Sequence, residues 1–424
     1  MNPPAEPESL GAYTRTLSGL VTAPLLSQAA LEAATRAMDG EAGAVVRRLY
    51  TLDLRRSRGA FFTPSDLARV LVKPHADAIR AGARILDPAC GAADLLLAAA
   101  DYMPNNGAAT WRRQLRGMDI DPDLIALAYQ RLRLKFRLAA PNTRTSTLTA
   151  TGTLQCADFF EVPARLVRAA DLILLNPPYS MTPAPRDWPH GEGIVTNAAL
   201  FLSKTIERAR EGTYISAILP DVLRSGSRYD RWRTAIATSC EISEVRTIGQ
   251  FDRWTDVDVF ILRLRVGALS VAREWPSPPT NPNSVSAHFD VTVGAVVPHR
   301  HSADGPTHPY IHARSLSGRR VLTKVIERRG FRGTVVAPPF VAIRRTSRPG
   351  DRSRYLATLV VGDTPVAIEN HIICAQPKNG TRKKCEELLK LLRHPKTITW
   401  LDERIRCRHL TVKAIREMAW TVGE

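Results

Sequence analysis

The tetrapeptide Asn176-Pro177-Pro178-Tyr179 is the part of the sequence whose residue types most directly suggest chemistry. It follows an apolar stretch, 171–175, that is typical of a buried strand. Two prolines fix φ and remove two backbone donors, so the loop presents peptide carbonyls and the Asn176 side chain as acceptors. Beside an aromatic face, such acceptors suit a planar NH2 group. The alternative interpretation is a proline-rich turn that packs Tyr179.

A second string, Asp87-Pro88-Ala89-Cys90-Gly91, ends the first apolar strand and precedes a helical stretch. In an open α/β sheet ligands bind at this place, and glycine lets the backbone approach them closely. By itself the string is equally consistent with an ordinary tight turn.

The next apolar strand ends in two aspartates, Asp119 and Asp121. A carboxylate at the tip of the second strand is the usual partner of ribose hydroxyls in nucleotide-type cofactors. Asp121 precedes Pro122, which is the arrangement of a helix N-cap followed by proline at the first helical position. We therefore expect Asp121 to cap a helix and Asp119 to bind ribose.

Short apolar strands alternate with helices around these strings, which favours an α/β fold with a doubly wound, mostly parallel sheet. Strands are expected within 83–90, 115–121, 153–160, 171–179, 213–220, 242–249 and 257–265, and helices over 94–102, 122–137, 197–210 and 228–239. The last two strands are joined too briefly for a crossover helix. They should form an antiparallel hairpin at the end of the sheet.

The flanking regions define the expected domains. Residues 1–57 form a helical lead-in with helices over 25–39 and 42–53, and residues 58–267 form the α/β domain. A helix should begin with Thr63 as its N-cap, Pro64 at its first position and Asp66 in its first turn, and it should run to about Arg80. A linker is expected at 268–284, before an α+β domain at 285–424 with helical segments around 382–393 and 411–419.

Charge separates the two halves of the chain. The net charge is +18, of which residues 1–267 carry +5 and residues 268–424 carry +13. A concentrated positive field favours a polyanionic partner, with nucleic acid first and an anionic membrane second, although a solvated basic surface is the plain alternative.

Composition excludes several classes. An apolar fraction of 44% excludes a disordered or fibrous chain. Six dispersed cysteines without a C-x-x-C pair indicate reduced thiols in a cytoplasmic protein. No signal pattern and no apolar run of about 18 residues is present, which predicts neither export nor a membrane span. Four histidines between 299 and 312 lack Cys or carboxylate at ligand spacing, so we expect no metal.

Together and in this order, the strings resemble the gamma-class S-adenosylmethionine-dependent N6-adenine DNA methyltransferases of restriction-modification systems. The resemblance runs from about Arg58 to Arg265 and more weakly through the C-terminal third. It implies a class I methyltransferase fold, S-adenosylmethionine as cofactor, and methyl transfer to N6 of a flipped-out adenine in double-stranded DNA. It also implies a C-terminal target-recognition domain and a separate cognate restriction endonuclease. We expect a monomer.

The resemblance assigns roles residue by residue. In 59–64, Thr63 and Pro64 would lie against the methionine part of the cofactor, which Asp87, Ala89 and Gly91 would also hold, while Asp119 would bind ribose. Asp158 would receive the cofactor's adenine amine and Phe159 would pack on its ring, although a strand-end cap and a core phenylalanine are equally plausible. The catalytic set would be Asn176, Pro177, Pro178, Tyr179 and Phe251, with Phe251 otherwise a core residue.

One residue departs from the family pattern. Ala93 stands where the family's first motif usually carries a second glycine. A methyl group is tolerable there if φ is negative, so the substitution puts cofactor affinity in question rather than the identity of the site.

In the C-terminal third, clustered basic side chains would supply phosphate contacts and guanine readout. They are Arg344, Arg345, Arg348, Arg352, Arg354, Lys378, Arg382, Lys383 and Lys384. Each alone is more often solvated surface, but as a group they favour nucleic acid.

Three other functions remain open at this point. The same loop chemistry serves methylation of RNA bases or of a protein glutamine, and the long basic domain favours DNA among these substrates. A DNA-recognition subunit with a decayed catalytic half is consistent with Ala93 but not with an intact Asn176-Pro177-Pro178-Tyr179. A fused nuclease is disfavoured, because the first fifty residues are too few and no nuclease motif is present.

Overall fold

The computed structural model describes residues 7–59, 61–104, 111–139, 153–267, 275, 281–316, 320–347, 354–406 and 409–421. The chain divides into two compact units, Met1–Leu223 with Arg231–Trp275 and Arg224–Asp230 with Pro276–Glu424. We call them the first and second units. Most of the expected linker at 268–284 lies outside the described residues.

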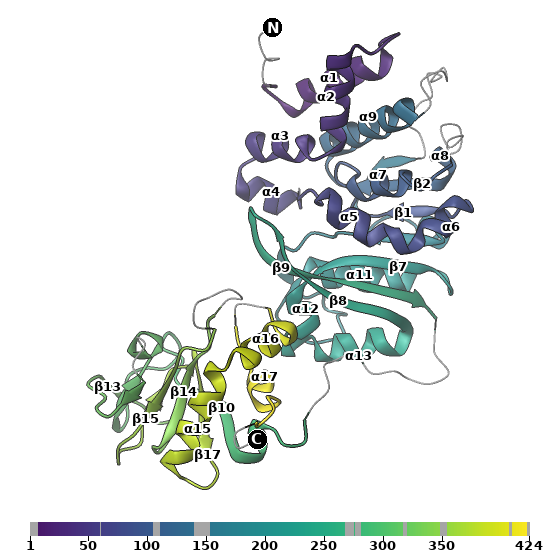
Figure 1. Cartoon of the computed structure of the whole chain (residues 1–424). Coiled ribbons are helices and arrows are strands. Elements are labelled where there is room, and N and C mark those ends of the chain that lie inside the picture. Colours follow the sequence, from purple (N-terminus) through teal and green to yellow (C-terminus); the bar gives the residue numbers. More distant parts are fainter. Residues whose placement is uncertain are drawn as a thin grey trace. The chain divides into compact units, whose positions relative to one another are not determined.

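The first unit is built on a seven-stranded sheet of order β3-β2-β1-β4-β7-β9-β8 (Figure 1). The strands are β1 (Ile85–Asp87), β2 (Leu115–Asp119), β3 (Leu154–Cys156), β4 (Leu172–Leu175), β7 (Tyr214–Pro220), β8 (Cys240–Asp252) and β9 (Thr255–Val266). The first five pair in parallel, and β9 is antiparallel to both β7 and β8. The expected fold class and terminal hairpin are therefore confirmed.

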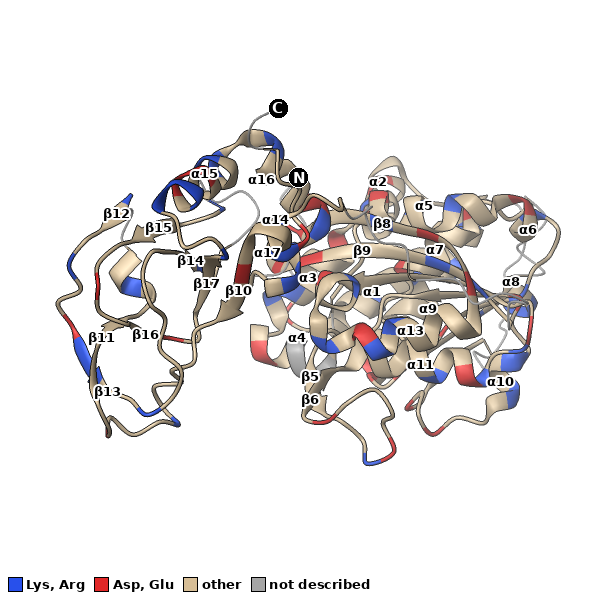
Figure 2. Cartoon of the chain, turned by 90° about the horizontal axis from the view of Figure 1, so that it is seen from below, with Lys and Arg blue, Asp and Glu red and all other residues tan. Residues whose placement is uncertain are grey.

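Helices cover both faces of this sheet. Figure 2 shows α5 (Ser65–Val72) and α7 (Asp94–Ala100) on one side of β9, and α10 (Ala164–Arg168) and α11 (Asn197–Arg208) on the other. The unit also contains α6 (Ala76–Arg80), α8 (Trp111–Gln114), α9 (Pro122–Ala139), nearly all of α13 (Asp230–Ser239) and the hairpin β5 (Met181–Pro183) and β6 (Ile194–Thr196). Helix α12 (Asp221–Ser225) begins in the first unit and ends in the second.

Two local expectations need correction. The helix predicted from Pro64 to about Arg80 is interrupted by a 3-10 turn at Lys73–His75, because Pro74 lacks the N–H that a continuous helix needs. Pro64 rather than Thr63 occupies the N-cap position of α5. By contrast, Asp121 caps α9 as predicted, with its Oδ1 accepting from the backbone N–H of Asp123 at 2.9 Å.

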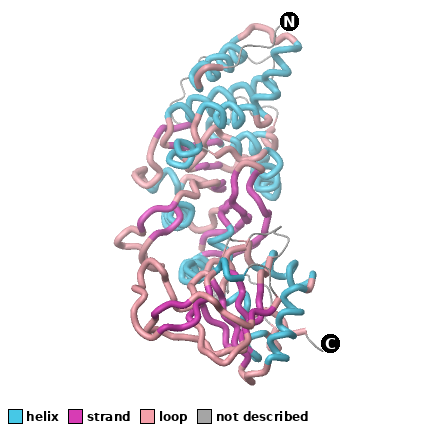
Figure 3. The backbone as a smooth tube through the Cα atoms, turned by 90° about the vertical axis from the view of Figure 1, so that its left-hand side faces the viewer, coloured by secondary structure: helices cyan, strands magenta, loops and turns pink. Residues whose placement is uncertain are grey.

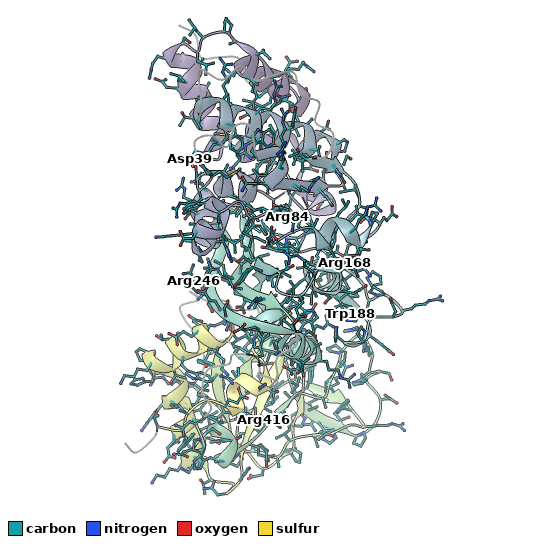
Figure 4. All side chains as sticks on the ribbon, turned by 90° about the vertical axis from the view of Figure 1, so that its right-hand side faces the viewer. Asp39, Arg84, Arg168, Trp188, Arg246 and Arg416 are labelled. Atoms are coloured by element: carbon teal, nitrogen blue, oxygen red, sulfur yellow. The ribbon has the colours of Figure 1, made fainter. Side chains whose placement is uncertain are left out.

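The N-terminal lead-in packs on the outside of α9. It consists of α1 (Leu10–Thr22), α2 (Gln28–Met38), α3 (Glu41–Leu49) and α4 (Leu52–Arg58), which gather in a helical layer (Figure 3). Tyr13 and Leu17 of α1 share a core with Leu124 and Leu127 of α9. Helix α1 was not predicted, although Ser9 caps it through a hydrogen bond from Ala12 N–H. Asp39, labelled in Figure 4, accepts a hydrogen bond from Ser65 Oγ and so links α2 to α5.

The second unit contains a five-stranded sheet of order β10-β17-β14-β15-β12 and a three-stranded sheet of order β13-β11-β16. The strands are β10 (Phe289–Val293), β11 (Thr307–Ile311), β12 (Val321–Leu322), β13 (Arg328–Gly330), β14 (Phe340–Arg344), β15 (Ala357–Val360), β16 (Ala367–Ile368) and β17 (Ile372–Pro377). The helices are α14 (Val285–His288), α15 (Arg382–Arg393), α16 (Pro395–Arg404) and α17 (Val412–Arg416). Leu388 and Leu392 of α15 are buried with Ile373 of β17 and Val341 of β14. Among the described helices, none is both long enough and apolar enough to cross a bilayer.

Candidate active site

A small pocket lies at the carboxyl ends of β1 and β4, where the loops that follow these strands meet the segment before α5. Thr63, Asp87, Ala89, Gly91 and Asn176 all line it. The sheet order explains this meeting, because β1 pairs in parallel with both β2 and β4 and their carboxyl ends share one edge. The structure thus brings together five residues from three separate strings of the sequence, 59–64, 87–91 and 176–179.

The pocket is acidic, and burial disfavours the charged forms of its carboxyls. Asp87 is 1% exposed, and burial raises the pKa of its carboxyl well above the usual range, with Asp119 and Asp94 adding negative charge. Burial also raises the pKa of Asp119, although its carboxylate accepts from the Gly91 and Asp121 N–H groups at 2.8 and 2.9 Å. A cationic ligand would stabilise the ionised form of both carboxyls. The donor set therefore fits the ammonium and sulfonium charges of S-adenosylmethionine.

Ala93 adopts the conformation expected of the glycine it replaces. Its φ is 72°, and its side chain is fully buried at the N-cap of α7. The condition of negative φ is therefore not met, and the left-handed backbone costs about 1–2 kcal/mol for a residue with a Cβ. The fold keeps the turn despite the methyl group, with Ala93 N–H donating to Cys90 O at 2.7 Å.

The Asn176 side chain is held from two sides. Its Nδ2 donates to Thr63 Oγ1 at 2.9 Å, and its Oδ1 accepts from the Tyr179 hydroxyl at 2.7 Å. Tyr179 Oη also lies 3.4 Å from Ile218 O, and burial raises the pKa of this phenol. The acceptor proposed for a substrate amine is thus occupied by a neighbouring hydroxyl, which an incoming base would displace.

Phe251 packs against Tyr179 as the sequence predicted for a pair of aromatic residues at one site. Their ring centroids are 5.9 Å apart and the planes meet at 82°. Phe251 is 4% exposed. Because an edge-to-face pair leaves no room for a planar base between the rings, at least one ring has to move before a base is held there.

Gly59 contacts the loop that carries Asn176 from the N-terminal side. It ends α4 with φ 64°, and a Cβ placed there would lie 2.9 Å from Pro178 Cβ. The lead-in helices therefore touch the loop that carries Asn176 through a residue that must be glycine.

We expect Gly59→Ala to lower methyl transfer because it combines a left-handed alanine, at about 1–2 kcal/mol, with a shift of Pro178. The matched control is Gly40→Ala, since Gly40 has φ 91° and a Cβ placed there would meet no side chain or backbone within 4 Å. The unfolding temperature should fall in both variants, and further in Gly59→Ala because of Pro178, whereas turnover should fall only in Gly59→Ala. Equal turnover in the two variants would show that the contact with Pro178 is unimportant.

Two residues expected to bind the cofactor's adenine have local structural roles. Asp158 Oδ1 accepts from Phe160 N–H at 2.8 Å, which is the capping alternative. Phe159 is 2% exposed and stacks on Phe201, with centroids 5.2 Å apart. One face of the Phe159 ring is thus covered by Phe201, and its contact with the cofactor's adenine stays a prediction. The neighbouring Phe160 is more exposed, at 37%.

The predicted nucleic-acid-binding set is only partly exposed. Arg348 and Arg352 lie outside the described residues. Arg354 is a correction: it is 1% exposed, pairs with Asp402 and donates to Ile405 O, so it cannot reach a phosphate. Arg345 is half-buried and donates to backbone carbonyls. Exposed positions remain at Lys378, Arg382 and Lys383, with Arg344 and Lys384 half-buried.

A buried ion pair that the sequence did not predict lies next to the pocket. Arg131 of α9 is 1% exposed; its Nη1 lies 2.8 Å from Asp94 Oδ1 and 2.6 Å from Ala92 O, and its Nε donates to Ala37 O. Asp94 Oδ2 in turn accepts from Thr63 N–H at 2.9 Å. An arginine among the apolar positions of α9 was the available signal, because such a residue needs a partner when buried.

Residues 45–246 match the family model described as N-6 DNA Methylase. This segment, just under half of the chain, is similar to the N-6 DNA methylase family. S-adenosylmethionine is accordingly its methyl donor.

Solved structures are similar to this chain at low sequence identity. The type IIL restriction-modification enzyme MmeI, solved in complex with DNA, is 10% identical with a TM-score of 0.52, over 90% of this chain and 69% of MmeI. The type IIG restriction endonuclease BpuSI is 14% identical with a TM-score of 0.46, over 86% of this chain and 59% of BpuSI. A Listeria monocytogenes protein described as a class I S-adenosylmethionine-dependent methyltransferase is 18% identical with a TM-score of 0.43, over 64% of this chain and 83% of that protein. This chain thus spans about three-fifths to two-thirds of the length of the two restriction enzymes.

Proposed function

We propose that this protein transfers a methyl group from S-adenosylmethionine to the N6 amine of an adenine flipped out of double-stranded DNA, as the modification enzyme of a restriction-modification system. The observation that carries the proposal is the position of the Asn176 amide, 2.9 Å from a wall residue of the acidic pocket, Thr63. A separate endonuclease that cleaves the unmodified site is part of the proposal.

The chain's own groups act on the nitrogen nucleophile. An exocyclic amine is a weak nucleophile because its lone pair is delocalised into the ring. Hydrogen bonds from its two N–H groups to Asn176 Oδ1 and the Pro177 carbonyl would favour a pyramidal nitrogen with its lone pair directed at the pocket. When bound, S-adenosylmethionine supplies an activated methyl group on a good leaving group. Positioning and electrostatics then supply most of the catalysis.

Tyr179 and Phe251 are proposed to hold the extruded base. Extrusion costs a few kcal/mol, which stacking on an aromatic face offsets. The hydrogen bond from Tyr179 to Asn176 satisfies the catalytic acceptor while the base is absent.

Tyr179→Phe and Tyr179→Ala should separate the two roles of this side chain. The phenylalanine keeps the stacking face and removes the competing hydroxyl, so we expect turnover within a few-fold of wild type and target binding that is equal or tighter. The alanine loses about 1–3 kcal/mol of stacking, which predicts roughly 5- to 150-fold weaker binding of the flipped base. Steady-state kinetics on a target duplex measure turnover and KM in each variant. Similar losses of activity in Tyr179→Phe and Tyr179→Ala would contradict a stacking role.

The second unit is proposed to grip the duplex through its basic surface. Figure 2 shows basic residues along α15, and Lys378 and Lys383 are exposed. We expect Lys378→Ala with Lys383→Ala to reduce the slope of log affinity against log salt by about 2, since each lost phosphate contact removes roughly 0.9. The matched control is Lys324→Ala with Lys396→Ala, which removes the same charge from exposed positions of the same unit. Titrations at several salt concentrations measure the slope. Equal slopes in the two double variants would mean that net charge, not this surface, governs binding.

Sequencing of methylated adenines in DNA from a host expressing the chain tests the reaction and reveals the site. N6-methyladenine at one sequence motif is the expected result. Unmodified host DNA, together with radiolabelled methyl transfer to RNA or to a protein glutamine, would support the alternative substrate classes instead.

A further inference from the structure

Thr63 occupies a position between the two halves of the active site. Its side chain is 7% exposed, lines the acidic pocket and carries the hydroxyl that meets Asn176 Nδ2 at 2.9 Å. Its backbone N–H is fixed by Asp94, which Arg131 holds in turn. The backbone of Thr63 is therefore anchored, and its hydroxyl is placed by the contact with Asn176.

The protein alone does not determine how the Asn176 amide is oriented. Both of its side-chain partners, Thr63 and Tyr179, are hydroxyls, and a hydroxyl donates or accepts. In the arrangement observed, Oδ1 faces Tyr179 and can accept from a substrate amine. In the reversed arrangement Oδ1 would accept the Thr63 proton, and Nδ2 would present donors to an amine that also donates.

We propose that Thr63 is a positioning residue through which the bound cofactor sets the orientation of the Asn176 amide. The cofactor's methionine part ends in an ammonium group, which suits the carboxyls of the pocket, and in a carboxylate, which only accepts hydrogen bonds; we assign the carboxylate to the Thr63 hydroxyl. A Thr63 hydroxyl that donates into the pocket must accept on its other side, and it then requires Nδ2 rather than Oδ1 of Asn176 to face it. The inference rests on the proposed function, because it concerns recognition of the N6 amine.

The consequence is a coupling between the two binding events. A hydrogen bond donated by Thr63 to the cofactor is compatible with only one orientation of the Asn176 amide, the one that accepts from adenine. Cofactor binding therefore favours that orientation over the reversed one. The cofactor should therefore tighten binding of a duplex with a target adenine more than binding of one whose target base lacks the amine.

The test is a cycle of duplex affinities measured by fluorescence anisotropy on the full chain. Affinities are taken with and without saturating S-adenosylhomocysteine, for the duplex identified by host sequencing and for the same duplex with purine in place of the target adenine. In the wild type, we expect S-adenosylhomocysteine to tighten binding of the adenine duplex at least about fivefold more than binding of the purine duplex.

The variants are Thr63→Val, which removes the hydroxyl at constant shape, and Thr63→Ser, which keeps it. Thr63→Val should lose the adenine-specific gain and Thr63→Ser should retain it. Thr205→Val is the matched control, because Thr205 is fully buried and its hydroxyl bonds only within its helix, to Phe201 O. If the valine variant does not fold, Thr63→Ala makes the same comparison.

A gain that persists in Thr63→Val, or that is absent in Thr63→Ser, would overturn the inference. Wild-type methyl transfer to the same adenine duplex is measured alongside. Its absence would refute the proposed function, whereas an active wild type with no effect at Thr63 would refute the inference alone.

Discussion

Asn176→Ala should lower the rate of methyl transfer by at least roughly 100- to 1,000-fold, the loss typical of removing one polar group aimed at a reacting centre. The side chain supplies the proposed acceptor for one N6 proton, and alanine leaves the amine without it. The same substitution removes the partner of both the Thr63 and the Tyr179 hydroxyls. Single-turnover transfer of radiolabelled methyl groups to DNA measures the chemical step, and anisotropy should show that duplex binding is largely retained.

Asn176→Gln tests whether position or mere presence of the amide is required. Glutamine keeps the functional group but displaces it by one methylene, and a shift of about 1 Å at a reacting centre can cost 100-fold. We therefore expect the glutamine variant to be impaired nearly as much as alanine. Wild-type turnover by the alanine variant would contradict the assignment of Asn176 as catalytic.

Asp94→Ala should destabilise the first unit by about 3–5 kcal/mol, because it leaves a buried arginine without its counter-charge. Arg131 is 1% exposed and retains only carbonyl partners once the carboxylate is gone. The substitution also removes the acceptor of Thr63 N–H, so the loss of stability should be accompanied by weaker activity. Urea unfolding followed by circular dichroism measures the change in free energy.

Asp101→Ala is the matched control for this prediction. Asp101, the C-cap residue of α7, pairs with Lys135 of α9, so this pair also joins the two helices. The Asp101 and Lys135 side chains are 43% and 28% exposed, so that pair is screened by solvent and its loss should cost about 0–1 kcal/mol. Equal destabilisation by the two substitutions would show that burial of Arg131 does not decide the effect.

The order of strands and helices in the first unit was predictable because apolar periodicity and turn residues are local properties of the sequence. The parallel sheet, the antiparallel hairpin of β8 and β9 and the cap at Asp121 all follow from residues within a few positions of each other. The motifs around Asp87 and Asn176 were readable for the same reason, since each is one strand end and its loop.

Partners far apart in the sequence decided the remaining features. Asn176 meets Thr63 across 113 positions, and Arg131 meets Asp94 across 37, so neither contact leaves a local pattern. Tertiary packing also buries Arg354, unlike the exposed basic residues, and stacks Phe159 on Phe201. The residue types alone do not distinguish Arg354 from the other arginines or Phe159 from Phe160. The sequence by itself determined which groups stand at the strand ends, whereas tertiary packing decided which are solvent-exposed and how their hydrogen bonds are satisfied, because burial and partners depend on the whole fold.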